Sequence, residues 1–160
     1  MASEADIALQ NLFERDEVVA GLHQHKGARR SRKTLRRGGG RGGDIVTNMM
    51  ALRDQVKLYH WQTKEFARHK ATDDLLVKLD ANIDMFVETY MGKYGRPSVS
   101  KPIKLSNFSE SAARSFVAGQ RKFLSVDLPK QLKSTDTDLL NIRDTILGDL
   151  NQVLYLFTLV

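Results

Sequence analysis

Apolar residues recur with a helical period from Asp44 onwards. Four stretches space their apolar residues three or four positions apart, as on one face of an α-helix. The expected helices cover about 44–67, about 70–94, a stretch from near Ser109 to near Pro129, and a last one whose start signal is Thr135 and Asp138. The face expected to be buried on the first helix is Ile45, Met49, Leu52, Val56, Tyr59 and Thr63, and that on the second is Leu75, Leu76, Leu79, Ile83, Phe86, Val87 and Tyr90. The face on the third helix is Ala112, Phe116, Gln120, Phe123 and Leu124. The face on the last helix is Leu139, Ile142, Ile146, Leu150, Val153, Leu154 and Phe157.

The connections between these helices differ in length. The first and last are short, whereas the middle one contains GRPSVSKPIKLSN, with Pro97 and Pro102 and no helical period. Fully extended, it can reach roughly 45 Å, which exceeds the ~30 Å length of a 20-residue helix. The order short, long, short predicts an all-α, ferritin-like four-helix bundle with one long crossover.

A basic segment precedes the bundle. Residues 26–43, KGARRSRKTLRRGGGRGG, contain no acid and eight cations, which are Lys26, Arg29, Arg30, Arg32, Lys33, Arg36, Arg37 and Arg41. Removing these eight charges from the net charge of +6 leaves −2 for the rest of the chain. The segment buries too little apolar surface to offset its ordering entropy, so we expect it to be disordered unless a partner holds it. The expected division is an extension, 1–43, with a short helix at 3–20, and a bundle, 44–160.

The partner of this basic segment is left open by the sequence. Arg/Gly segments bind nucleic acid through charge with little sequence readout. The same segment could thread along an acidic protein neighbour or remain a solvated tail. Nucleic acid and neighbouring proteins are therefore both expected partners.

Several classes of protein are excluded by composition. The chain has no Cys, which removes disulfide frameworks, thiolate zinc sites and Cys nucleophiles. The acidic start of the sequence is not a secretory signal, and the longest apolar stretch, VLYLFTLV, falls far short of the ~20 residues that span a bilayer. We expect a protein that has no transmembrane segment and is not secreted.

Candidate metal chemistry centres on LYHWQTKEFARH, residues 58–69. This stretch holds His60, Trp61 and His69, and the acids Asp80, Asp84 and Glu88 follow at i, i+4 and i+8. Each step of four residues turns the side chain by about 40° around the helix axis. The three acids are therefore expected at increasing distance from the buried face, with Asp80 near it, Asp84 at its edge and Glu88 further out. There is no Glu-x-x-His repeat, so the usual di-iron site within one bundle is excluded. The alternative is an ordinary helix corner with Trp61 as its buried anchor.

The stretch LYHWQTKEFARHKATDDLLVKLDANIDMFVETYMGKYGR, which starts at Leu58, resembles the first helix pair of Dps-type ferritins, small ferritins that coat and protect DNA. His60-Trp61, His69, Asp84 and Glu88 fall on that family's His-Trp, second His, Asp and Glu in order. The resemblance implies an iron site with two His from one subunit and two acids from its dimer mate. The corner between the helices is shorter here than in that family.

A closer resemblance is to a ferritin-like family of unknown function found in large DNA viruses and phages. LYHWQTKEFARHKATDDL and DTDLLNIRDTILGDLNQVLYLFTL are similar to its two signature regions, and the likeness covers roughly 45–160. It implies a fold and a viral setting rather than a chemistry, and with that setting a location in a virion or inside a host cell.

Three functions are consistent with these patterns. The first is a non-catalytic structural protein of a virion, such as a minor capsid protein, whose basic segment tethers neighbours or genome and which needs no cofactor. The second is a Dps-like ferroxidase that binds iron and DNA. The third is a nucleic-acid-binding accessory protein without catalysis. We expect the first, and a homo-oligomer is compatible with all three.

Overall fold

Four α-helices and no strand make up the part of the chain that the structure, a computed structural model, describes, residues 38–99 and 101–159. The described residues belong to one unit of the chain, Lys33–Val160. The helices are α2 (Gly38–Gln62), α3 (Phe66–Tyr94), α4 (Glu110–Lys122) and α5 (Thr137–Leu156). The expectation of four helices is confirmed for this part of the chain, whereas the short helix expected at 3–20 lies outside it.

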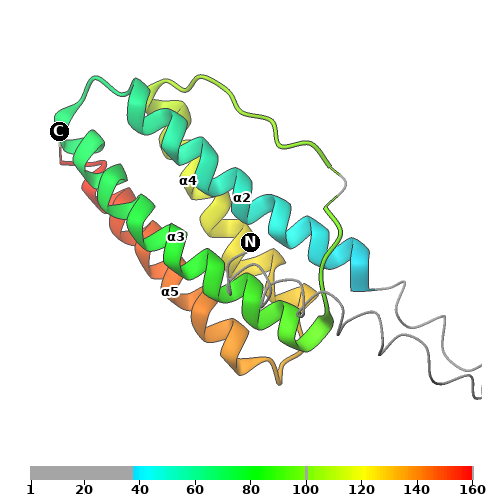
Figure 1. Cartoon of the computed structure of the whole chain (residues 1–160). Coiled ribbons are helices and arrows are strands. Elements are labelled where there is room, and N and C mark those ends of the chain that lie inside the picture. Colours follow the sequence, from blue (N-terminus) through cyan, green and yellow to red (C-terminus); the bar gives the residue numbers. More distant parts are fainter. Residues whose placement is uncertain (1–37, 100, 160) are drawn as a thin grey trace, which may run out of the picture. The chain divides into compact units, whose positions relative to one another are not determined.

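The directions of the helices follow from the connections. Figure 1 shows α2 and α3 antiparallel, a long connection that returns along α2, α4 running in the direction of α3, and α5 running back. Residues 63–65 alone separate α2 from α3, and α3 packs against both α2 and α5. The connection at 95–109 carries no helix or strand in its described residues, as its two prolines predicted. None of the described helices is long and apolar enough to cross a membrane.

The core is built from the predicted apolar stripes, with one shift. The faces predicted for α2 up to Tyr59, for α3 and for α5 supply its buried residues. On α4 the prediction was one position off, because the buried residues are Ala113 and Val117 while Phe116 is only half-buried. The aromatic rings at the edge of the stripe misled the prediction. Beyond α4, a π-helical turn, η2 (Phe123–Asp127), and a 3-10 turn, η3 (Pro129–Gln131), continue the chain and bury Leu124 and Leu128.

Helix α2 begins at Gly38, inside the Arg/Gly segment, and not near residue 44 as predicted. Glycine is a poor helix former, so its use here needs a packing reason. A Cβ on Gly43 would lie 2.1 Å from the carbonyl oxygen of Ser98, and one on Gly42 would lie 2.8 Å from the Tyr90 ring. The missing side chains let the connection and α3 pass close to the start of α2.

The connection is fastened to α2 by polar contacts. The Gln55 side chain donates to the Ser106 carbonyl at 2.7 Å and accepts from the Ser106 N–H at 2.9 Å. Lys101 forms an ion pair of 2.7 Å with Asp44. The reciprocal amide pair gives the connection a fixed register on α2 although it has no regular structure.

Asp136 organises the start of α5 and was not part of the predicted start signal. It is the N-cap position, but its buried carboxylate makes no capping bond. Instead it accepts from the Lys133 N–H at 2.8 Å and from the Tyr94 hydroxyl, and it pairs with Lys93 at 3.3 Å. Burial opposes ionisation, but these three donors outweigh it and lower the pKa of Asp136. The helix therefore begins where a carboxylate ties it to the end of α3.

Candidate functional site at the corner of α2 and α3

The turn between α2 and α3 is closed by local hydrogen bonds. The Thr63 N–H donates to the Tyr59 carbonyl at 2.9 Å, which completes α2. The Thr63 hydroxyl accepts from the Glu65 N–H at 3.2 Å, and the His69 N–H donates to the Glu65 carbonyl at 2.9 Å as α3 begins. This tight corner brings the last turn of α2 and the first turn of α3 side by side.

The two histidines of the corner stack on each other. Their ring centroids lie 4.0 Å apart with an interplanar angle of 21°. His60 Nδ1 lies 3.1 Å from the His69 carbonyl oxygen, and His69 Nδ1 lies 3.0 Å from the His60 carbonyl oxygen. Because a carbonyl only accepts, both Nδ1 atoms carry a proton, and in the neutral rings each Nε2 keeps its lone pair.

His60 is the buried member of the pair. It is 6% exposed, and its Nδ1 also lies 3.1 Å from the Thr72 hydroxyl oxygen. Burial first, and then the neighbouring His69 ring, lower the pKa of His60. Its Nε2 lies 4.0 Å from an Asp73 carboxylate oxygen. Burial therefore favours the neutral form of His60, and the two Nε2 atoms are the positions from which a metal could be ligated.

Arg68 lies beside the histidines and joins all four helices. It donates to the Glu110 carbonyl at 2.9 Å and to the Phe157 carbonyl at 3.2 Å, and it pairs with the Glu110 carboxylate at 3.2 Å. The Glu110 carboxylate also accepts from Tyr59, and from Thr63 at 2.8 Å. Burial, and then this bond to Glu110, raise the pKa of Tyr59. The four side chains Tyr59, Thr63, Arg68 and Glu110 are called the Arg68 cluster below.

The predicted acids do not meet the histidines within one chain. Asp84 and Glu88 are exposed on α3, and at a rise of 1.5 Å per residue they lie roughly 22 and 28 Å beyond His69 along the helix. Asp80 is exposed rather than near the buried face, and Arg53 donates to it at 2.7 Å. Among the described residues, no group of three or more His, Asp or Glu could hold a metal ion.

Comparison with known proteins places the chain in a family. Residues 60–157 match the pattern of a family of unknown function, DUF5856. The chain belongs to this family. It is also 31% identical over 94 residues to an uncharacterised 14.6 kDa protein from the mobD–ri intergenic region of Enterobacteria phage T4, a match that covers 57% of this chain and 73% of the relative. No solved structure matches the chain.

The DUF5856 match begins at His60 and ends at Phe157. It therefore contains the whole histidine pair, and Arg68 with two of its partners, Glu110 and Phe157. Most of α2 lies before the match. The expectation of an uncharacterised family with a phage member is confirmed at this level.

Trp61 is not a buried anchor, and that prediction was wrong. Its side chain is 68% exposed, and Lys57 Nζ lies 5.5 Å from the ring centroid. Consecutive helical residues point about 100° apart, so with His60 turned towards α3 the next residue faces solvent. Phe66, the first residue of α3, is 79% exposed on the other side of the turn. The corner thus presents two bare aromatic rings.

Sequence reasoning missed the Arg68 cluster although one signal was present. Arg68 precedes Thr72, Leu75 and Leu79 at helical spacing, so it continues the buried stripe of α3. A cation in such a stripe needs a buried partner. The partner, Glu110, could not be identified because it follows the long connection.

The predicted basic segment is almost entirely beyond what the structure describes. Lys26, Arg29, Arg30, Arg32, Lys33, Arg36 and Arg37 lie outside the described residues, and Arg41 lies near the start of α2.

Proposed function

We propose that this chain is a non-catalytic interaction protein of a phage or virus particle, such as a minor capsid protein. In this proposal the helical bundle docks on a neighbouring protein through the corner of α2 and α3. The Arg/Gly segment tethers a neighbour or the genome. The observation that carries the proposal is the exposure of Trp61 and Phe66, at 68% and 79%, on two sides of one turn.

Exposed aromatic rings of this kind favour a protein partner. Trp and other aromatic residues are enriched at the centres of protein interfaces and supply much of their binding energy. The Arg68 cluster and the stacked histidines fix the backbone beneath the two rings. Little conformational entropy is then lost when a partner covers them.

The family and the order of the helices support the viral setting. The uncharacterised relative comes from a phage, Enterobacteria phage T4. The long connection between the second and third helices, with α3 and α4 running in one direction (Figure 1), supports a ferritin-like bundle.

The test is incorporation into particles. Purified particles of the phage or virus that encodes the chain are analysed by quantitative mass spectrometry, with wild type and a Trp61→Ala, Phe66→Ala variant supplied in parallel. We expect wild type at a fixed copy number per particle and a loss of at least about tenfold for the variant, which corresponds to about 1.4 kcal/mol of docking free energy.

A matched control tests whether the loss of any exposed apolar side chain, rather than of the two corner rings, lowers incorporation. Met85 is also a large apolar residue, 52% exposed, on α3 away from the corner. The Met85→Ala variant should be incorporated like wild type. Absence of the wild-type chain from particles would sink the proposal, and equal incorporation of all variants would remove the corner from it.

A second candidate, a Dps-like ferroxidase, is favoured by the histidine pair alone. Ligating histidines commonly donate their other ring N–H to a carbonyl, as His60 and His69 do. Because Asp84 and Glu88 are far along α3, they could complete the site only from a second copy of the chain. We expect this candidate to show iron oxidation that disappears in His69→Ala and in Asp84→Ala. Oxidation at the rate of buffer, with no iron bound to the protein, would end it.

A further inference from the structure

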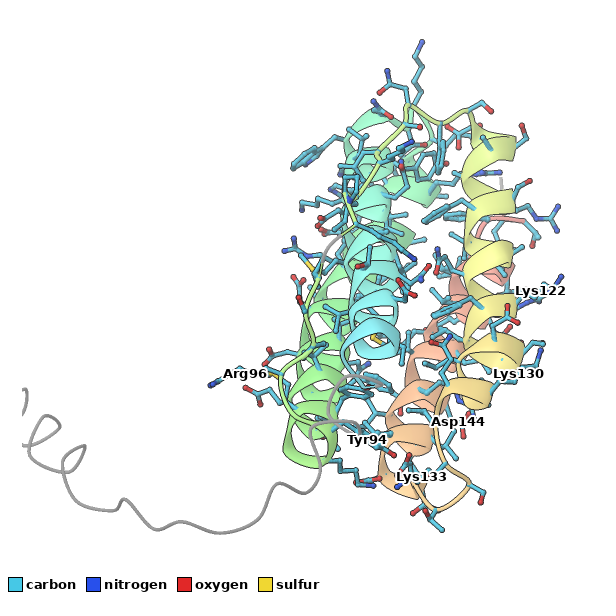
Figure 2. All side chains as sticks on the ribbon, turned by 90° about the vertical axis from the view of Figure 1, so that its right-hand side faces the viewer. Tyr94, Arg96, Lys122, Lys130, Lys133 and Asp144 are labelled. Atoms are coloured by element: carbon cyan, nitrogen blue, oxygen red, sulfur yellow. The ribbon has the colours of Figure 1, made fainter. Side chains whose placement is uncertain are left out.

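The outer face of α4 carries the cations Arg114, Arg121 and Lys122, called here the α4 cationic face. All three are exposed. Arg114 and Arg121 are seven residues apart and therefore lie on one side of the helix, about 10 Å from each other along its axis. Figure 2 shows Lys122 pointing away from the bundle, on the opposite side of the view from Arg96.

No carboxylate neutralises this face. Among the described residues, the acidic groups nearest in sequence are engaged elsewhere: Glu110 with Arg68, and Asp127 with Lys130 at 3.4 Å. Residues 111–126 contain no Asp or Glu, and no described carboxylate forms an ion pair with the three cations. Four cations elsewhere in the described residues pair with acids, namely Arg53, Lys78, Lys93 and Lys101. Three other exposed cations, Lys64, Arg96 and Lys104, also lack a described ion pair, but they do not share one helix face.

Small residues separate the cations. The exposed positions between and beside them are Ser111, Ser115, Gly119 and Ser125. Short side chains allow an extended ligand to approach the helix closely, so that the longer cationic side chains can reach that ligand. Serine hydroxyls add hydrogen-bond donors that suit phosphate oxygens.

The chemistry of the face selects its ligand. Guanidinium groups bind phosphate oxygens in bidentate geometry, and a row of them fits a linear polyanion. Each strand of a duplex carries one phosphate per ~3.4 Å of helix axis, so two arginines about 10 Å apart along that axis span the rise of about three phosphates. Binding to single strands normally adds aromatic stacking, but the one exposed large apolar residue described on this segment is Val126. The face therefore fits a duplex backbone rather than unstacked bases.

We propose that the α4 cationic face binds the phosphate backbone of double-stranded nucleic acid without sequence readout. The α4 cationic face shares no residue with the Arg/Gly segment or with the corner of α2 and α3. It stands whether or not the chain is a particle component, because it rests on residues that the proposed docking corner does not use.

The experiment compares two variants with equal loss of charge. The first is Arg114→Gln, Arg121→Gln, Lys122→Gln. The second is Lys64→Gln, Arg96→Gln, Lys104→Gln, which removes three exposed cations that also lack a described ion pair. Full-length proteins are titrated into a labelled duplex of mixed sequence, and the dissociation constant is followed by fluorescence anisotropy over a range of salt concentrations.

We expect the α4 variant to lose affinity and to lower the slope of log affinity against log salt by about 0.9 per lost contact, hence by about 2.7 for three contacts. The control variant should keep the wild-type slope. Arg114→Lys, Arg121→Lys keeps the charge and should retain duplex binding, which guards against a folding defect in the glutamine variant. Circular dichroism verifies the helix content of each protein.

Three results would overturn the proposal. One is a wild-type protein that does not bind duplex at low salt. Another is an equal loss in both triple variants, because it would reflect net charge alone. The third is an α4 variant that binds duplex normally but loses binding to phosphatidylserine vesicles, because the face would then recognise a membrane surface.

Discussion

At one end of the bundle a buried arginine, Arg68, joins four helices, whereas at the other end a buried carboxylate, Asp136, joins the end of α3 to the start of α5. Arg68 reaches carbonyls of Glu110 and Phe157 that are 42 and 89 residues away in sequence. Asp136 accepts from Lys133 three residues before it, and from Tyr94. Arg68 therefore ties α3 both to α4 and to the residue that follows α5, whereas Asp136 ties only the end of α3 to the start of α5.

The difference predicts how each end fails. If the Arg68 cluster is broken, buried groups on several helices lose their partner together. If Asp136 is changed, one of its three donors, the Lys93 ammonium, can still be solvated, since the Lys93 side chain is one-third exposed. We therefore expect changes in the Arg68 cluster to lower the free energy of unfolding more than changes at Asp136 do.

The largest expected effect is that of Arg68→Met. This change keeps an apolar stem but leaves the Glu110 carboxylate and the Phe157 carbonyl without their cationic donor. Breaking a buried pair by removing one partner costs about 3–5 kcal/mol, and because Glu110 is partly exposed we expect about 3 kcal/mol. The free energy of unfolding is measured by urea denaturation.

Arg143→Met provides the matched control for Arg68. Arg143 is also nearly buried, with 12% of its side chain exposed, and it donates to the Leu124 carbonyl at 3.0 Å, but its acidic partner, Asp144, is exposed. Its loss should cost about 1 kcal/mol, the usual value for one net hydrogen bond. Equal destabilisation by the two variants would contradict a special role of the Arg68 cluster.

Gly43→Ala tests the close approach near the Asp136 end. Its new Cβ would lie 2.1 Å from the Ser98 carbonyl oxygen, so the backbone of the connection must move. Overpacking of this kind costs about 1–3 kcal/mol, and we expect about 2 kcal/mol by urea denaturation.

Gly148→Ala on α5 should act in the opposite sense. A Cβ there meets nothing within 4 Å, so the change should stabilise the protein by about 0.5–1 kcal/mol through helix propensity. If Gly43→Ala were stabilising as well, the glycines at the start of α2 would have no packing role.

The apolar helix faces and the polar contacts of the corner differ in how far the sequence could predict them. The buried apolar residues of α2, α3 and α5 were predicted, because residues on one face of a helix recur three or four positions apart in the sequence. The stacking of His60 on His69 and the bond from Arg68 to Glu110 depend on how helices pack, which spacing does not encode. The burial of Trp61 was predicted from its residue type alone. In the structure His60 faces α3, so the next residue, Trp61, faces solvent.

Asp136→Asn should cost less than Arg68→Met or Gly43→Ala and should alter the pH dependence of stability. The lowered pKa of Asp136 means that its contribution is present above the ordinary value of 3.8 and is lost as the pH falls through the folded-state pKa. Removal of the charge should cost about 1.5 kcal/mol at neutral pH and flatten the acid limb of the stability curve.

The titration of Tyr94 at alkaline pH tests the hydrogen bond between Tyr94 and Asp136. Burial, and then the bond to Asp136, raise the pKa of Tyr94 to about 12. The tyrosinate absorbance of wild type should show this late titration, and Asp136→Asn should move it towards lower pH. An unchanged titration in the variant would mean that the Tyr94 hydroxyl is not bonded to Asp136.

The smallest expected effect on stability is that of Trp61→Ala. A residue that is 68% exposed and contacts a cation, Lys57, loses little on truncation, so the change should stay within about 0.5 kcal/mol. The same tryptophan should be readily quenched by iodide in the wild-type protein. A loss above about 1.5 kcal/mol, or a ring shielded from quencher, would show that the corner is closed over Trp61 and would withdraw the aromatic pair from the docking proposal. A small loss, set against the large one at Arg68 a few residues away, would separate the residues that hold the corner together from those that it presents.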